Sequence, residues 1–353
     1  MENNKKHTSG KRIALSILCV VLAIILATLI FFTIEVRSLL GKINRFGNDD
    51  VTLSSEQLES ILAEKDPTDP NFTGPVIDNN EVTIPNAENI TSENVINILL
   101  VGQDRRPGEP RMHSDSMILC TVNKSSKTIT LTSFLRDTWV YIPGYGNERL
   151  NVPYMLSGGF SRLNETLDYN FGVSADHNIE VDFSGFTTII DKIGGVEIEL
   201  TAAEANHLNQ KGNWDLEQNP EWTLYAGKNT LNGSQALAYS RIRALDNDMG
   251  RSNRQRNVIT ALIEKLQGMQ TTDIYDMVKS ILPLLTTDMT DSQILGYVVE
   301  FGPILSQYKI VSQRIPADGA YEFASIDGKS VIYLSPENLE KNIQILKDTI
   351  LKK

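Results

Sequence analysis

From residue 94 onward, hydrophobic residues fall into short runs that alternate with segments of helical periodicity. The runs at 95–101, 116–122 and 128–134 are continuous or alternating in hydrophobicity, which is typical of buried strands. Two further strands are predicted at 177–183 and 196–200. Between and after them the pattern predicts helices at 154–170, 186–193, 232–239 and 252–267. Strands that alternate with helices favour the α/β class, so we expect a layered α/β/α domain around a central mixed β-sheet.

The longest apolar run lies near the N-terminus. Residues 13–34 include no charged side chain, and at ~1.5 Å per residue they are long enough to cross the ~30 Å hydrocarbon core of a bilayer. Residues 1–12 are polar and basic, which favours a cytoplasmic N-terminus. A cleaved signal peptide is the alternative, but its apolar region is usually only ~7 to 15 residues long. We therefore expect a single-pass transmembrane helix, with the remaining chain outside the cell membrane.

The rest of the chain divides by composition into a linker, a core and a C-terminal region. Residues 35–93 are rich in Asn, Asp, Pro, Ser and Thr and are predicted to form an extracytoplasmic stalk with one short helix at 53–63. Residues 94–268 form the predicted core, in which the polar segment 201–230 is expected to be an excursion loop. The helices and strands predicted over 269–353 either complete the domain or form an appendage.

Composition narrows the possible functions. The chain has 353 residues with 41% hydrophobic content, enough for a sizeable core, and a formal net charge of −11. This acidity argues against a nucleic-acid-binding protein, which usually carries a basic face. Cys19 and Cys120 are the only cysteines, and their positions favour neither a disulfide nor a zinc site. The phosphate-loop, nucleophile-elbow and His-Glu-x-x-His motifs do not occur in the sequence.

Arginine and aspartate are concentrated at three places despite the overall acidity. The densest place is the segment 241–256, which contains five arginines, and arginine can bind phosphate oxygens with two donors at once. Arg136 and Asp137 follow the third predicted strand. The third place lies between the first two strands and contains Asp104, Arg105, Arg106, Arg111, His113 and Asp115. Because ligands of α/β sheets bind at strand ends, we expect these segments to meet.

The meeting of these segments predicts a phosphate pocket. Asp104 and Asp115 bracket one short loop, and two carboxylates with phosphate oxygens are a usual set of ligands for Mg²⁺. The arginines that would surround the same phosphates are Arg136, Arg241, Arg243 and Arg251. Phosphoryl transfer depends mainly on such positioning and charge neutralisation. The alternative is that each cluster is a solvated face of arginines paired with nearby acids.

The helix predicted at 252–267 orients the arginines around it. Ser252 and Gln255 have capping-box spacing, which predicts that the helix begins there. Its apolar stripe, extended backward with helical spacing, points Gln255 and Arg251 inward. The same phase leaves Arg254 and Arg256 for the surface.

The sequence resembles the LytR-CpsA-Psr family. The motifs that carry the resemblance lie in order at 97–104, 114–119, 136–144, 181–186, 194–196 and 231–256. The resemblance implies a domain that transfers a glycopolymer, such as teichoic acid or capsule polysaccharide, from a polyprenyl-pyrophosphate carrier to peptidoglycan. The reaction would be a phosphotransfer that forms a phosphodiester and releases polyprenyl phosphate. The expected partners are the carrier-linked glycopolymer, the peptidoglycan acceptor and the membrane, with no nucleic acid.

The resemblance also implies roles for individual residues. Asp104 and Asp115 would bind Mg²⁺, with Mn²⁺ as an alternative, and Asp137 or Asp248 would assist the acceptor proton. Long apolar elements would line a tunnel for the lipid. The residues that would hold the pyrophosphate are Arg136, Arg241, Arg243, Arg251 and Gln255.

Two departures from the family pattern and two alternative functions remain. His113 stands where the family often has arginine, so Arg106 or Arg111 would supply that charge. Leu135 stands where the family often has proline, which would change only the stiffness of the loop. The same site would also suit a non-catalytic envelope or regulatory protein that binds lipid pyrophosphate, or a polyprenyl-pyrophosphate hydrolase.

Overall fold

The computed structural model describes residues 44–45, 53–66, 72–82, 85–103, 109–210 and 222–352. The cytoplasmic tail and the transmembrane helix predicted at 13–34 lie outside these ranges. Among the residues that are described, no helix is both long enough and apolar enough to cross a bilayer.

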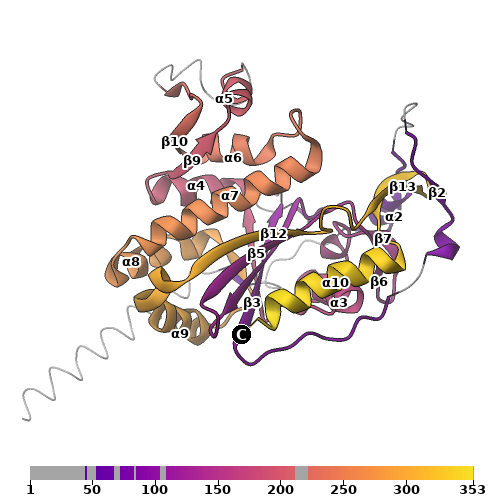
Figure 1. Ribbon diagram of the computed structural model, residues 1–353, viewed down its shortest axis with the longest axis horizontal. Helices are drawn as coiled ribbons and strands as arrows, with labels where there is room; N and C mark the ends of the chain where they lie inside the picture. Colours follow the sequence, from indigo (N-terminus) through magenta and orange to yellow (C-terminus); the bar gives the residue numbers. More distant parts are fainter. Residues whose placement is uncertain are drawn as a thin grey trace, which may run out of the picture. The chain divides into compact units, whose positions relative to one another are not determined.

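A mixed seven-stranded sheet forms the centre of the described chain (Figure 1). Its strands, in spatial order, are β1 (Asn44–Arg45), β11 (Thr286–Thr287), β8 (His177–Asp182), β3 (Val95–Gln103), β4 (Ser116–Asn123), β5 (Thr128–Phe134) and β12 (Lys309–Ile315). Strands β8, β3, β5 and β12 run in one direction, while β4 and β11 run in the other. The carboxyl ends of β3, β5 and β8 therefore open at the same edge, together with the start of β4.

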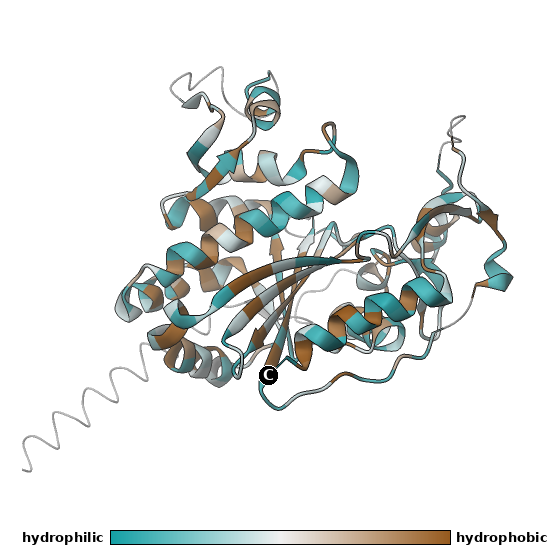
Figure 2. Cartoon of the chain, in the orientation of Figure 1, coloured by the Kyte–Doolittle hydropathy of each residue, from teal (hydrophilic) through white to brown (hydrophobic). Residues whose placement is uncertain are grey.

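Alternate residues of the central strands pack into two different cores, because side chains along a strand point to opposite faces. Leu99 and Met117 face the cluster that includes α3 (Phe160–Phe171) and α10 (Pro336–Ile350). Leu100 and Ile118 face the opposite cluster, which includes side chains of α7 (Asn247–Gln267). Figure 2 shows the apolar stripes of these helices interrupted by polar outer faces. Helices thus cover both faces of the sheet, which is the α/β/α arrangement that the sequence predicted.

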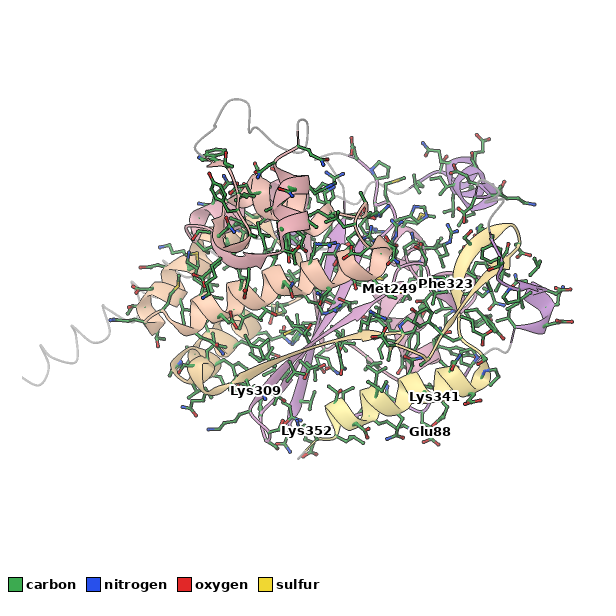
Figure 3. All side chains as sticks on the ribbon, turned by 45° about the horizontal axis from the view of Figure 1, so that its top comes forward. Glu88, Met249, Lys309, Phe323, Lys341 and Lys352 are labelled. Atoms are coloured by element: carbon green, nitrogen blue, oxygen red, sulfur yellow. The ribbon has the colours of Figure 1, made fainter. Side chains whose placement is uncertain are left out.

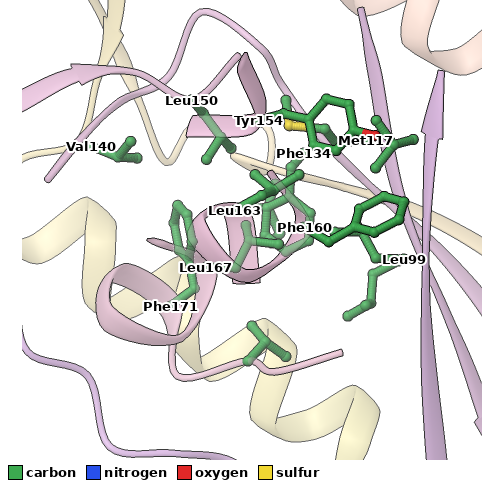
Figure 4. Close-up of a cluster of buried hydrophobic side chains, with 14 of the residues drawn as sticks. Leu99, Met117, Phe134, Val140, Leu150, Tyr154, Phe160, Leu163, Leu167 and Phe171 are labelled. Atoms are coloured by element: carbon green, nitrogen blue, oxygen red, sulfur yellow. The ribbon is translucent and has the colours of Figure 1, made fainter. Parts of the chain in front are cut away.

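The larger core lies between the sheet and α3 (Figure 4). Helical spacing directs Phe160, Leu163, Leu167 and Phe171 toward the strands, where Phe171 lies 5.4 Å from Phe134 between ring centroids. Burying each side chain of this size contributes ~1.5–3 kcal/mol. Gly172 ends α3 with φ +70°, and a Cβ there would lie 2.2 Å from the carbonyl oxygen of Glu88. The segment that leads into β3 therefore packs directly on the end of this helix.

A second group of elements lies beside the end of the sheet that carries the charged residues. Strands β9 (Val196–Leu200) and β10 (Gly227–Leu231) form their own antiparallel pair and do not join the central sheet. They share a core with α4 (Phe183–Lys192), α5 (Ala202–Leu208) and α6 (Gly233–Arg241). The prediction of one loop over 201–230 is therefore wrong for α5 and β10, and residues 211–221 lie outside the described ranges. Asn232 caps α6 through its capping box with Gln235.

Part of the predicted stalk packs on the domain. The helix α2 (Ser55–Ala63) places Leu58 and Ile61 against the main core, and Ile90 is buried in it. The two-residue strand β2 (Val76–Ile77) pairs with the C-terminal strand β13 (Glu322–Ile326). The helix predicted at 53–63 is confirmed by α2. The expectation of an extended stalk does not hold for these segments, because their few apolar side chains pack on partners that lie far away in sequence.

Residues 269–353 complete the domain, which settles the choice that the sequence left open. They supply β12 at the edge of the sheet, and α10 buries Ile343, Leu346 and Ile350 in the main core. The remaining elements are β6 (Trp139–Ile142), β7 (Gly146–Arg149), α8 (Thr271–Ile281), α9 (Asp291–Phe301), β14 (Lys329–Tyr333) and short 3-10 turns at Asn79–Glu81, Pro153–Met155, Leu282–Leu284 and Gly302–Gln307.

The role of α10 can be tested by truncating one buried side chain. Leu346 is 1% exposed, so Leu346→Ala is expected to lower the free energy of unfolding by about 2–5 kcal/mol through lost burial and a residual cavity. Lys341→Ala, on the solvent side of the same helix, is the matched control; it removes only a solvent-exposed ion pair with Glu337 and is expected to leave the free energy of unfolding nearly unchanged. Urea denaturation of the two variants measures the difference, and equally small losses would show that α10 is an appendage.

Candidate functional site

A cavity of about 320 Å³ opens beside the carboxyl ends of β3 and β8, under the first turns of α7. Its volume is within the ~300–1,000 Å³ range that is usual for ligand pockets. Charged and polar side chains of three segments line one part of it: Asp115, Arg241, Arg243, Arg251 and Gln255. The structure thus brings together five of the residues that the sequence assigned to the phosphate pocket. A small adjoining hollow adds Arg136 and Asp248.

Arg136 links three carboxylates that come from three different segments. Its Nη1 donates to Oδ1 of Asp115 at 2.9 Å, and its Nε donates to Oδ2 of Asp248 at 3.1 Å. Oδ1 of Asp137 lies 3.6 Å from the same Nε. The burial of the guanidinium would lower its pKa, but the three carboxylates hold the pKa of Arg136 above its ordinary value. Arg136 therefore stays charged and keeps the end of β5, the start of β4 and the start of α7 in one place.

Asp248 is the point where the arginines of the 241–256 segment meet Arg136. Its Oδ1 lies 3.3 Å from Nε of Arg243 and 3.4 Å from Nη2 of Arg251. Arg251 is buried, and within the described residues its Nε has no hydrogen-bond partner. A buried cation with an unused donor on a cavity wall is suited to bind an anion such as phosphate.

Asp137 and Asp248 form a carboxyl pair that titrates as a unit. Burial and the hydrogen bond with Asp248 raise the pKa of Asp137 to about 6. Burial pushes the pKa of Asp248 upward, but the hydrogen bond with Asp137 and the charges of Arg136 and Arg243 hold it below its ordinary value. The shared proton therefore resides on Asp137. A carboxyl group that titrates near neutral pH is suited to accept a proton from a hydroxyl group.

The helix α7 begins earlier than the sequence predicted. It starts at Asn247 rather than at Ser252, and Ser252 instead donates its hydroxyl hydrogen to the carbonyl oxygen of Met249 at 3.1 Å. The capping-box interpretation is therefore wrong, and Arg251 lies in the second turn of the helix. Gly250 makes the earlier start possible, because a Cβ at this position would lie 2.0 Å from the side chain of Asp246. The positive end of the helix dipole consequently lies closer to Arg243 and Asp248.

Arg254 and Arg256 are buried, which corrects their predicted place on the surface. Arg254 is 3% exposed and donates from Nη1 and Nη2 to both carboxylate oxygens of Asp246, at 2.8 and 2.6 Å. Its Nε donates to Glu204 of α5 at 2.7 Å. Arg256 donates from Nε to Ser312 of β12 at 2.7 Å. The side of α7 that the apolar pattern left for solvent is covered by α5 and by β12, so these two arginines hold the helix in place.

Of the six residues of the cluster between β3 and β4, three are described, and among these only Asp115 lines the cavity. Asp104, Arg105 and Arg106 lie outside the described residues. Arg111 is buried with its guanidinium 5.9 Å from the ring centroid of Tyr154, and it is not part of the cavity wall. Burial lowers the pKa of His113 despite the nearby carboxylates of Glu148 and Asp115, so the imidazole is mostly neutral at pH 7. His113 therefore does not replace the charge of an arginine.

Most of the rest of the cavity wall is apolar, with Ser116, Asp182 and Ser240 as further polar positions, and the sequence did not assign these residues individually to the site. The apolar lining comes from both sides of the cavity: Leu100, Ile118, Phe183, Phe186, Val258 and Ile259. Phe183 also orients a cation, since the guanidinium of Arg241 lies 4.8 Å from its ring centroid. Phe183 and Phe186 follow β8 at the start of α4. In the sequence, a pair of aromatic residues directly after the end of a predicted strand was the signal that could have identified them as residues of the cavity wall. The arrangement can hold an anionic headgroup at one end and a hydrocarbon chain at the other.

Of the two carboxylates predicted to bind a divalent cation, only Asp115 lies within the described residues. Asp115 offers carboxylate oxygens on the cavity wall, with about a third of its side chain exposed, and such oxygens suit a hard divalent cation. Within the described ranges, no group of three or more His, Cys, Asp or Glu side chains is arranged to hold a metal ion. Any metal site would therefore need Asp104 or oxygens of a bound substrate.

Comparison with protein families and curated sequences gives related proteins. The sequence model of the LytR_cpsA_psr family matches residues 55–348, a longer stretch than the motifs at 97–256. Polyisoprenyl-teichoic acid–peptidoglycan teichoic acid transferase TagU of Bacillus licheniformis is 31% identical over 237 residues, which cover 66% of this chain and 72% of TagU. Regulatory protein MsrR of Staphylococcus aureus is 28% identical over 263 residues, which cover 73% of this chain and 75% of MsrR.

Solved structures share the fold. Bacillus subtilis TagT superimposes with a TM-score of 0.58 at 22% identity, over 76% of this chain and 98% of TagT. A second structure of TagT, with bound octaprenyl pyrophosphate lipid, gives a TM-score of 0.54 at 20% identity, over 77% of this chain and 98% of that one. The mixed α/β fold is therefore that of these proteins.

The buried role of Arg254 predicts a large effect on stability. Arg254→Met leaves Glu204 and Asp246 without their cation, so the free energy of unfolding is expected to fall by about 3–5 kcal/mol. Arg243→Met removes a half-exposed arginine of the same segment and is expected to change it by less than ~0.5 kcal/mol. Chemical denaturation compares the two variants, and a similar small loss for both would place Arg254 at the surface.

Proposed function

The chain belongs to the LytR-CpsA-Psr family, and we propose that it transfers a glycopolymer from a polyprenyl-pyrophosphate carrier to peptidoglycan. The observation that carries the proposal is the meeting of Asp115, Arg136, Asp248 and Arg251 at one end of an apolar cavity. Charged groups and a hydrocarbon pocket in one site match the two halves of a lipid pyrophosphate. The name of TagU and the octaprenyl pyrophosphate bound to TagT support this choice of substrate.

The proposed reaction is an in-line displacement at phosphorus. A sugar hydroxyl of peptidoglycan forms a bond to the phosphorus next to the glycopolymer, and the bond from that phosphorus to the bridging oxygen breaks. The bridging oxygen leaves with polyprenyl phosphate, and the hydroxyl proton passes to the pair of Asp137 and Asp248. Arg251 and Arg243 neutralise the charge that develops on the phosphate oxygens. The apolar wall around Phe183 and Val258 holds the first part of the lipid chain.

We also propose a divalent cation and a location. Asp115 and Asp104 would hold Mg²⁺, or Mn²⁺, which would neutralise further charge on the pyrophosphate. The domain would face the outside of the cell membrane behind a single transmembrane segment at 13–34, where the carrier lipid is within reach. This arrangement is supported by the length of the apolar run and its basic flank.

Two substitutions test the transferase site. Arg251→Ala and Asp115→Ala are each expected to lower transfer at least ~100-fold while the protein stays folded. Arg251→Ala removes a cation that faces the pyrophosphate, and Asp115→Ala removes a partner of Arg136 and a proposed ligand of the divalent cation. Arg162→Ala, in a surface pair on α3, is the control and should transfer normally. The assay combines the full-length chain, Mg²⁺, a polyprenyl-pyrophosphoryl saccharide and peptidoglycan oligomers, and detects the linked product by mass.

The same assay distinguishes the alternative functions. Release of polyprenyl phosphate without a linked product would identify a hydrolase. Donor binding with no release at all would identify a binding or regulatory protein. Normal transfer by both substituted proteins would refute the site assignment.

The carboxyl pair predicts how transfer depends on pH. Only the deprotonated pair can accept the hydroxyl proton, and the pKa of Asp137 is about 6. At saturating donor, the rate is therefore expected to rise with pH through about 6 and then to level off. Asp137→Asn should lose this inflection and lower the rate by ~10²–10⁴-fold, as expected for a general base. A variant profile that keeps the inflection near pH 6 would assign the proton to another group.

A further inference from the structure

Two aromatic side chains pack beside the start of α7, and neither of them lines the donor cavity. Tyr321 and Phe323 are in edge-to-face contact, with ring centroids 5.5 Å apart and an interplanar angle of 82°. Phe323 is 53% exposed and Tyr321 is half-buried. Neither ring lines the cavity beside α7.

One contact ties this aromatic pair to the start of α7. The hydroxyl of Tyr321 donates to Sδ of Met249 at 3.2 Å, and Met249 directly follows Asp248 in the helix. Figure 3 shows Met249 and Phe323 next to each other on the same side of the molecule. The aromatic pair therefore packs on the first turn of α7, at the residue that follows Asp248.

A second contact ties it to Asp137. Phe323 in β13 stands opposite Ile332 in β14, and the backbone N–H of Ile332 donates to the carbonyl oxygen of Asp137 at 2.9 Å. The neighbouring residues Ala324 and Val331 point to the other face of the hairpin, where they are buried in a small core with Trp139. The hairpin is thus anchored by its other face, and the core does not require Phe323. Its exposed ring is free to contact a ligand.

We propose that Tyr321 and Phe323 form a platform on which a pyranose ring of the peptidoglycan acceptor stacks. The inference rests on the proposed transferase function and names the place where the second substrate binds. A pyranose ring presents a face of C–H groups, which is attracted to the negative face of an aromatic ring, while its hydroxyl groups stay available at the rim. A sugar on this platform has its hydroxyl groups beside Asp137 and Asp248, where the proton is accepted.

The charges around the platform do not form the basic patch that an anionic membrane surface would need. Asp318 is paired with Arg314, Glu322 is exposed next to Tyr321, and the pair of Asp137 and Asp248 is neutralised by Arg136 and Arg243. Attraction of anionic lipid headgroups depends on an excess of lysine and arginine, which these residues do not provide. A neutral N-acetylated sugar needs no such excess, and its hydroxyl groups can donate to the carboxylates.

The test separates acceptor binding from donor binding and from chemistry. Tyr321→Ala and Phe323→Ala are each expected to raise the KM for peptidoglycan oligomers about tenfold, the loss of one stacking contact, with kcat and the KM for the lipid donor unchanged. Tyr225→Ala removes a ring that is 70% exposed near β10 and should leave all three constants unchanged. Tyr321→Phe keeps the ring and loses only the contact with Met249, so it should remain close to the original protein.

A direct binding measurement keeps this inference distinct from the transferase proposal. Ligand-observed NMR of an N-acetylglucosamine trisaccharide with the full-length chain should show binding that the double variant Tyr321→Ala, Phe323→Ala loses, whether or not transfer occurs. Equal signals from the original protein and the double variant, including no binding by either, would overturn the platform. So would a double variant that keeps the trisaccharide but no longer adsorbs to vesicles of anionic phospholipid, because the pair would then be a membrane contact.

Discussion

The guanidinium of Arg136 is the interaction on which the arrangement of the site depends. It lies between Asp115, Asp137 and Asp248, which belong to the start of β4, the end of β5 and the start of α7. Three carboxylates this close would repel one another strongly in a half-buried site if no cation lay among them. The charge of Arg136 therefore holds the strand ends and the helix together, and beside it burial and the hydrogen bond with Asp248 raise the pKa of Asp137 to about 6.

The arginines of α7 and of the loop before it fall into two groups. In one group other residues of the protein neutralise the charge of the guanidinium, and in the other group they do so only in part. Arg254 uses its whole guanidinium inside the fold, on Asp246, Glu204 and the carbonyl oxygen of Ile242. Arg251, one turn earlier, has a long contact with Asp248 and a buried Nε without a partner in the described chain. A buried arginine of the first kind stabilises the helix, while one of the second kind keeps a donor available for an anion. Within four positions, the same residue type thus builds the site and, in the proposed function, binds its ligand.

Local sequence patterns predicted β3, β4, β5 and β8 of the central sheet and the inward direction of Arg251 and Gln255, because both follow from periodicity within one element. They failed for Arg254, whose partner Glu204 lies 50 residues earlier on α5. Periodicity identifies the apolar face of α7 but cannot show that another element covers the opposite face. The same limit explains why the segment of α2 was assigned to a stalk. Its few apolar side chains pack on elements that are distant in the chain, and a local pattern does not reveal such partners. Residues that act through tertiary contacts were missed, while those in regular elements next to strand ends were found.

The C-terminal region changes how the whole site is understood. Sequence motifs end near residue 256, so the sequence alone places both substrates on the motif-bearing core. In the structure the apolar cavity lies between the sheet and α7. The hairpin of β13 and β14 is instead hydrogen-bonded to the backbone of Asp137, through the N–H of Ile332. The cluster of Arg136 with Asp115, Asp137 and Asp248 therefore lies between the apolar cavity and the hairpin that carries Phe323. A displacement at phosphorus needs its entering and leaving oxygens on opposite sides of the phosphorus atom. In the proposed transfer, with the lipid in the cavity, the hydroxyl enters from the side of Asp137, where the hairpin of β13 and β14 adds residues that lie outside the motifs.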